Sequence, residues 1–119
     1  MTAYQQLEVW QRSIKLIKRI YTITDIFPEK ERYRLTDQMC RAVTSIPANL
    51  AEGSVRKSTK DFMRFVAIAM GSLAELETHL VIAVELGYVK RVKLIEVEKE
   101  CDIIGKQLHA LYNALGRKK

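Results

Sequence analysis

The chain has 119 residues, a formal net charge of +6 at neutral pH, and 48% hydrophobic and 29% charged residues. This composition is typical of one globular domain and excludes a disordered chain. The N-terminal residues lack the basic-then-apolar profile of a signal peptide, and no apolar run approaches the roughly 20 residues of a membrane span. We therefore expect a cytoplasmic protein that does not bind membranes, with Cys40 and Cys101 as free thiols.

Apolar residues recur at helical spacing along the whole chain, which contains only two prolines and five glycines. The first predicted helix covers approximately residues 5–25. Its expected core positions alternate in steps of three and four: Leu7, Trp10, Ile14, Ile17, Tyr21 and Thr24. Phe27-Pro28 ends this pattern, and Pro28 followed by Glu29 suits the start of a second helix over approximately 30–53.

A third helix is predicted over approximately residues 58–86 and a fourth over 90–115. Ser58 or Thr59 suits the N-cap of the third helix, and Gly87 suits its C-terminal end. The fourth helix has the most regular apolar positions: Leu94, Val97, Cys101, Ile104, Leu108, Leu111 and Leu115. Four such helices joined by short loops predict one all-α domain over residues 1–119, an antiparallel up-down-up-down four-helix bundle.

The third helix carries more apolar surface than one bundle contact requires. Its apolar residues cover more than half of the helix circumference, and Val9, Ile20 and Ile23 lie outside the main stripe of the first helix. No helix is fully central in a bundle of four similar helices. This excess therefore predicts an oligomer.

Two stretches carry residues that helix interiors normally avoid. Proline there costs about 3 kcal/mol and glycine about 1 kcal/mol, so Pro47 and Gly71 indicate a specific kink or close contact. One turn after Pro47, we expect Asn49 and Glu52 to satisfy backbone groups that the kink leaves free. Gly71 and Gly105 are expected to permit close approach of another helix.

Glu75 and Glu77 do not form an acid–base pair, because two residues on a helix are about 200° apart. We expect one of them to pair with an arginine such as Arg41 or Arg64, fixing helix register or a subunit contact. The predicted structural residues are Arg41, Pro47, Asn49, Glu52, Gly53, Gly71, Glu75 and Glu77.

No sequence motif of an enzyme is found. Neither His79 nor His109 follows a glutamate at the spacing of a di-iron bundle, and there is no phosphate-binding glycine loop or nucleophile elbow. Cys101 and His109 are about two turns, roughly 12 Å, apart on one helix, too far to share a metal ion. We predict no catalytic site, no metal and no cofactor.

The basic charge is unevenly distributed. Residues 59–89 carry two basic and four acidic groups, whereas residues 90–119 carry eight basic and four acidic groups. Such a basic surface favours polyanions. The predicted phosphate contacts are Arg12, Lys15, Lys18, Arg19, Arg56, Lys57, Lys60, Lys90, Arg91 and Lys93. Two alternatives remain open: these cations only maintain solubility, or they bind an acidic protein surface.

An ordered set of motifs runs through the chain. They are Leu7-Glu8-Val9-Trp10-Gln11, Phe27-Pro28, Tyr33-x-Leu35, Gln38, Arg41-Ala42, Ser45-Ile46-Pro47-x-Asn49-x-Ala51-Glu52-Gly53, Phe62, Phe65, Gly71-Ser72-x-x-Glu75-Leu76-Glu77 and Leu86-Gly87-Tyr88. Over about residues 5–112 the chain thereby resembles the four-helix-bundle proteins encoded in intervening sequences of bacterial 23S rRNA genes.

The resemblance implies a homopentamer. The same fold includes the accessory variability protein of diversity-generating retroelements, which associates with a reverse transcriptase and binds nucleic acid. We therefore expect a non-catalytic oligomer that binds RNA or DNA backbone as an accessory or ribonucleoprotein component. The alternative is a structural adaptor for a protein partner, such as a reverse transcriptase, with no nucleic-acid role.

Overall fold

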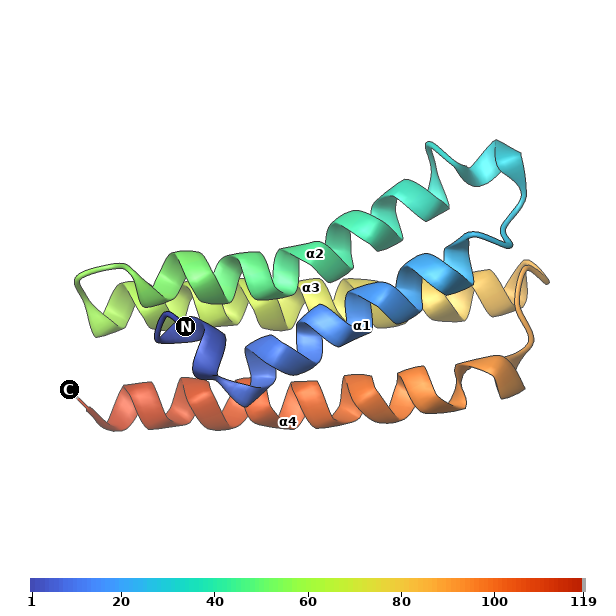
Figure 1. Ribbon diagram of the computed structural model, residues 1–119. Helices are drawn as coiled ribbons and strands as arrows, with labels where there is room; N and C mark the ends of the chain where they lie inside the picture. The colour runs from blue at the N-terminus through green and yellow to red at the C-terminus, as the bar shows by residue number, and fades with distance from the viewer. Residues whose placement is uncertain (119) are drawn as a thin grey trace.

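The computed structural model describes residues 1–118 as four α-helices in an antiparallel bundle (Figure 1). The helices are α1 (Glu8–Thr24), α2 (Leu35–Ser54), α3 (Thr59–Glu85) and α4 (Ile95–Arg117). Each packs on the next along the chain, and α1 packs on α4 to close a bundle with extents of 47 × 24 × 24 Å. The predicted all-α four-helix bundle is confirmed. Lys119, the last residue of the expected domain, lies outside the described residues.

Three of the helices begin later than the apolar pattern predicted. α1, α2 and α4 start at Glu8, Leu35 and Ile95 rather than near residues 5, 30 and 90. A short 3-10 helix occupies each predicted start: η1 (Tyr4–Gln6), η2 (Glu29–Glu31) and η3 (Arg91–Leu94). Apolar spacing alone cannot distinguish such a turn from the first turn of an α-helix.

A buried carboxylate explains the late start of α2. Glu31 is only 7% exposed. Its Oε1 accepts a hydrogen bond from the Leu35 backbone N–H at 3.3 Å, and its Oε2 accepts one from the Tyr88 hydroxyl at 2.6 Å. The Tyr88 ring also packs on Phe27, with 5.5 Å between the ring centroids. Glu31 therefore caps α2 and connects the α1–α2 turn to the α3–α4 turn.

We expect Tyr88→Phe to reduce the acid sensitivity of the fold. The hydrogen bond from Tyr88 is the main cause that holds the pKa of Glu31 below its ordinary value of 4.5. A carboxyl with a lowered pKa stabilises the fold at higher pH, and that contribution is lost as pH falls through the folded-state pKa. The melting temperature of Tyr88→Phe should lie below that of the wild type near neutral pH, and the gap should narrow below about pH 4.5. An equal gap at all pH values would exclude Glu31 as the responsible group.

The buried face of α1 differs from the predicted one. The buried positions are Val9, Ser13, Leu16, Ile20 and Thr24. The prediction was wrong for Ile14 and Tyr21, which are 41% and 46% exposed, while Trp10 and Ile17 are half-buried. The helix carries two apolar stripes side by side, and the buried one contains a serine. The Ser13 hydroxyl is satisfied by donating to the Trp10 carbonyl at 2.8 Å, so burying it leaves no unpaired polar group.

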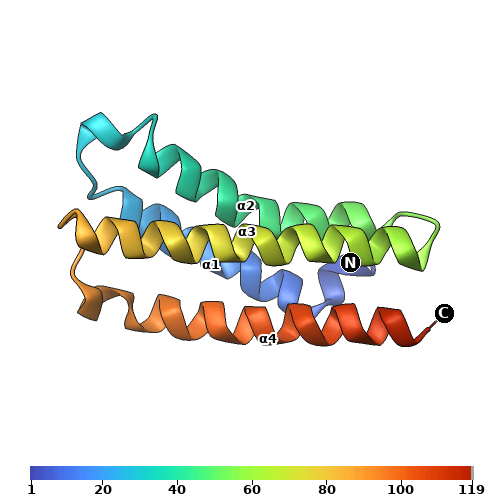
Figure 2. The same ribbon diagram turned by 180° about the vertical axis from the view of Figure 1, so that it is seen from behind.

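Pro47 lies inside α2, with twelve residues of the helix before it and seven after it. Figures 1 and 2 show α2 lying along α3 over its C-terminal half and diverging over its N-terminal half. Beside this point the Ser45 and Ser72 hydroxyls share a hydrogen bond of 2.8 Å between α2 and α3. The Asn49 side chain donates to the Ser45 carbonyl and hydroxyl, both at 2.8 Å. Asn49 thus bonds the Ser45 carbonyl and not the Val43 carbonyl, which is the group that Pro47 leaves without its usual donor, so this expectation was wrong. Asn49 also orients the serine that links the helices.

The glycines within the helices have different roles. At Gly53 an added Cβ would lie 2.6 Å from the Cβ of Phe65, so only glycine fits where α2 meets α3. At Gly105 the nearest atom would be a Leu73 methyl at 3.3 Å, a close approach of α3 and α4. At Gly71 an added Cβ meets nothing within 4 Å. The expectation of a close helix contact therefore holds for Gly105 but is wrong for Gly71 within the single chain.

The long helix α3 is the most apolar of the four. By length and composition alone it could span a membrane, with a mean hydropathy of 1.5 over its best window. The sequence analysis expected no membrane span. Scattered polar residues such as Glu75 do not lower the mean hydropathy of this 18-residue stretch enough to exclude one. In the structure 39% of that window is buried among the other helices. A core helix passes the same test, so this property is weak evidence for a membrane role.

Candidate nucleic-acid interface

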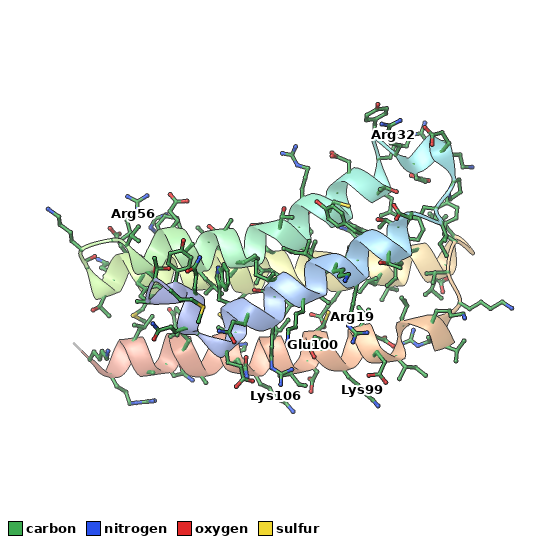
Figure 3. All side chains as sticks on the ribbon, in the orientation of Figure 1. Arg19, Arg32, Arg56, Lys99, Glu100 and Lys106 are labelled. Atoms are coloured by element: carbon green, nitrogen blue, oxygen red, sulfur yellow. The ribbon has the colours of Figure 1, made fainter. Side chains whose placement is uncertain are left out.

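A shallow groove between α1 and α4 brings together basic residues from distant parts of the chain. Lys15, Lys18 and Arg19 lie within two turns of α1, and Lys93 from η3 lines the same groove. Figure 3 shows Arg19 and Glu100 at this α1–α4 boundary. Among residues 1–118, no carboxylate lies within 4 Å of the charged nitrogens of these four cations. The side chains are therefore available to an external anion.

Arg12 has a structural role instead. Its guanidinium bonds Glu8 at 2.7 Å and Glu100 at 2.8 and 3.0 Å. The Gln107 amide also donates to Glu8, at 2.8 Å. The hydrogen bond from Arg12 lowers the pKa of Glu8, and the hydrogen bond to Glu8 raises the pKa of Arg12. Because both carboxylates already occupy the guanidinium, Arg12 clamps α1 to α4, and we remove it from the candidate phosphate contacts.

The α2–α3 loop lies at the opposite end of the bundle from η3 (Figure 1). Arg56 bonds Glu52 at 2.8 Å, and its guanidinium lies 5.0 Å from the Phe65 ring centroid. Glu52 therefore pairs with a side chain and does not satisfy the backbone beside Pro47, so that expectation was wrong. Lys57 and Lys60 are exposed, but they are separated along the bundle from the α1–α4 groove.

The third predicted cluster is divided by the structure. Lys93 joins the α1–α4 groove, whereas Arg91 bonds Glu98 at 3.3 Å and lines the boundary of α3 and α4. Lys90 is exposed at the start of η3. Lys93 is therefore the member of this cluster that the structure places beside the α1 cations.

The predicted pairing of Glu75 or Glu77 with an arginine is absent from the part of the chain that the structure describes. The nearest carboxylate to Arg64 is Asp61, at 3.9 Å, and no ion pair involves Arg41. Asp61 lies one turn before Arg64 on the same helix, so Arg64 pairs with this neighbour and not with Glu75 or Glu77. Glu75 is exposed on α3, so the predicted pairing does not fix helix register within the chain, and its pairing across a subunit contact stays a prediction.

The two cysteines are free. Burial raises the pKa of the Cys101 thiol to about 12, with a smaller contribution from Glu77, so the thiol stays protonated and packs as a small apolar group. Partial burial also raises the pKa of Glu77, and the negative charge of Asp102 adds to this effect. Within residues 1–118 no group of three or more His, Cys, Asp or Glu side chains is arranged to hold a metal ion.

The sequence analysis listed Lys93 as a phosphate contact but did not predict that η3 and α4 complete the groove. Local spacing identified Lys15, Lys18 and Arg19 as neighbours, since they lie three and four residues apart. It did not place Lys93 beside them, nor Glu100 against Arg12. The signal that could have found these contacts is the antiparallel topology, which sets the start of α4 against the end of α1.

A comparison with known families identifies the chain. The family model of the 23S rRNA-intervening sequence protein matches residues 5–110. The chain belongs to this family. A similar solved structure is that of a protein of unknown function from the S23 ribosomal protein family of Bacteroides thetaiotaomicron. It is 25% identical, has a TM-score of 0.80, and the match covers 87% of this chain and 97% of that one. The curated proteins include no match to the chain. The resemblance drawn from the motifs is confirmed.

Proposed function

We propose that this family member is a non-catalytic, self-assembling helical bundle of the cytoplasm that binds the phosphate backbone of RNA or DNA. The observation that supports this proposal is the groove between α1 and α4, where Lys15, Lys18, Arg19 and Lys93 have no carboxylate partner among the described residues 1–118. Cations held on a rigid scaffold without counter-ions attract polyanions, and affinity then depends steeply on salt.

The groove chemistry suits the backbone better than the bases. It is lined by the cations together with Thr22, Ile23, Val97 and Glu96. Within the described part of the chain, no aromatic ring lines the groove on which a base could stack. The Thr22 hydroxyl already donates to the Lys18 carbonyl at 3.0 Å. Phosphate contacts position a protein on nucleic acid without reading sequence. The proposed binding is therefore governed by charge and shape.

The test is a salt titration of nuclease-treated protein with structured RNA and with duplex DNA. The variant combines Lys15→Gln, Arg19→Gln and Lys93→Gln. Each lost phosphate contact should reduce the slope of log affinity against log salt by about 1, giving a total reduction of roughly 3. Affinity near physiological salt should fall at least about tenfold.

A matched control removes the same charge elsewhere. It combines Arg32→Gln, Lys99→Gln and Lys106→Gln, whose cations pair with Glu29, Glu96 and Asp102 (Figure 3). This control should bind almost as the wild type does. Equal losses in both variants would mean that net charge alone attracts the polyanion. No binding by the wild type at low salt would exclude the nucleic-acid role.

Self-assembly is the second part of the proposal. The resemblance implies five copies, which together would carry a charge of about +30. Apolar side chains exposed on α1 and α3 support assembly, because large exposed apolar patches are uncommon on monomers. Light scattering on the titration sample measures the assembled mass.

The alternative is a structural adaptor for a protein partner, such as a reverse transcriptase. The exposed Ile68, Val81 and Ile82 of α3 favour it, since an apolar helix face can bind a partner helix. Co-purification of a defined partner that survives nuclease treatment, with no nucleic-acid binding, would select this function.

A further inference from the structure

The bundle leaves one apolar stripe of α1 incompletely covered. Trp10 and Ile17 are half-buried, and Ile14 and Tyr21 are exposed. These four residues, here the α1 stripe, recur every three or four residues and so share one side of the helix. They lie beside the buried face and do not line the basic groove toward α4, which is formed by Lys15, Lys18 and Arg19.

A second apolar surface lies on α3. Its members are all exposed and share the side of α3 that faces away from the bundle. We define the α3 outer face as Ala67, Ile68, Gly71, Ala74, Thr78, Val81 and Ile82. Val81 alone is 51% exposed. Gly71, where an added Cβ meets nothing in the chain, leaves room at the centre of this face for a side chain from outside.

Opposite charges border the two surfaces. Glu77 lies one helical turn from Ala74 and one from Val81 of the α3 outer face. Lys18 lies one helical turn from Ile14 and one from Tyr21 of the α1 stripe, and no carboxylate among residues 1–118 lies within 4 Å of its charged nitrogen. Contact of either surface with its own copy brings like charges together, whereas contact of one surface with the other brings opposite charges together.

We propose that the α3 outer face of one copy docks on the α1 stripe of the next copy. This inference rests on the proposed self-assembly and assigns its contact surfaces. The surfaces lie on different sides of the protomer, since α1 is in front of α3 in Figure 1 and behind it in Figure 2. Such a contact is heterologous, so each copy offers one surface to each of two neighbours, and the assembly closes as a ring or extends as a filament.

Two single-surface variants test the assignment. Ala74→Arg blocks the α3 outer face, and the double variant Ile14→Arg, Tyr21→Arg blocks the α1 stripe. All three positions are exposed in the single chain, so the bundle should keep its helical circular dichroism. The melting temperature should fall only by the stabilisation that assembly supplies. Ile103→Arg makes the same kind of change at a 36% exposed position on α4 and serves as the control.

Native mass spectrometry should give single chains for each blocked variant and the wild-type mass for Ile103→Arg. Mixing the two blocked variants should give a two-chain species, because each retains the surface that the other has lost. If the α3 outer face instead paired with itself, the α1 variant would stay associated and mixing with the α3 variant would give no mixed pair. An oligomer unaffected by both variants would overturn this assignment alone, whereas a single-chain wild type would overturn the proposed self-assembly with it. The salt titration of Ala74→Arg tests the basic groove separately.

Discussion

Leu108→Ala should lower the free energy of unfolding by about 2 to 5 kcal/mol. Leu108 is fully buried near the middle of α4 and belongs to the single core formed by all four helices. Truncation removes apolar contact and leaves a cavity that close-packed neighbours fill only partly. Denaturant unfolding followed by helical circular dichroism gives the value, provided that the slope with denaturant is unchanged.

A change on the outer side of the same helix provides the control for Leu108. Ile103 is 36% exposed, and Ile103→Ala should cost less than about 1 kcal/mol. Both substitutions introduce alanine into α4, so helix propensity hardly differs between them. A cost below about 1 kcal/mol for Leu108→Ala would contradict the register of α4.

Gly53→Ala should destabilise the fold by about 1 to 3 kcal/mol, although alanine is the better helix former. The new Cβ would lie 2.6 Å from the Cβ of Phe65 and 3.0 Å from a ring carbon of Phe62. The Phe65 Cβ is fixed to the α3 backbone, so relief requires α2 and α3 to separate where they pack along each other. Thermal and denaturant unfolding of the two proteins measures the difference.

Gly71→Ala is the matched comparison for Gly53. It also replaces a helical glycine by alanine, but nothing in the chain lies within 4 Å of the added atom. The single chain should therefore gain about 0.5 to 1 kcal/mol. If Gly53→Ala lowers the free energy of unfolding and Gly71→Ala raises it, side-chain packing and not helix propensity determines the effect at Gly53. Both changes are measured in the Ile14→Arg, Tyr21→Arg background, where assembly is blocked. A gain in stability for Gly53→Ala there would contradict the close packing of α2 on α3.

The sequence predicted the fold because its strongest signal is long-range helical periodicity broken at few points. Phe27-Pro28 and Gly87 are local signals, and they lie at the turns that the structure contains. The predicted buried face of α1 was wrong, because this helix has two neighbouring apolar stripes and the one that is buried includes Ser13. The late start of α2 depends on the contact of Glu31 with Tyr88, 57 residues apart, which no local pattern reveals.

The candidate site was predictable only where it depends on one helix. Lys15, Lys18 and Arg19 share a groove because of their spacing. The clamp formed by Arg12 required knowledge of Glu100, which is 88 residues away. Charge counting therefore identified basic segments but could not tell which cations are already neutralised. Arg12 and Arg56 are paired with carboxylates, whereas no carboxylate among residues 1–118 lies within 4 Å of the charged nitrogen of Lys15 or Lys93.

The bond between Glu31 and Tyr88 has a consequence for how the bundle opens. It lies at the end where α2 diverges from α3, so it adds to the packing of Leu35 and Met39 on the core there. At the other end, Gly53 keeps α2 directly against α3. We therefore expect the first turns of α2 to open as a unit of local unfolding. Protonation of Glu31 should speed hydrogen exchange of their backbone amides, while the amides of the C-terminal half of α2 should stay protected.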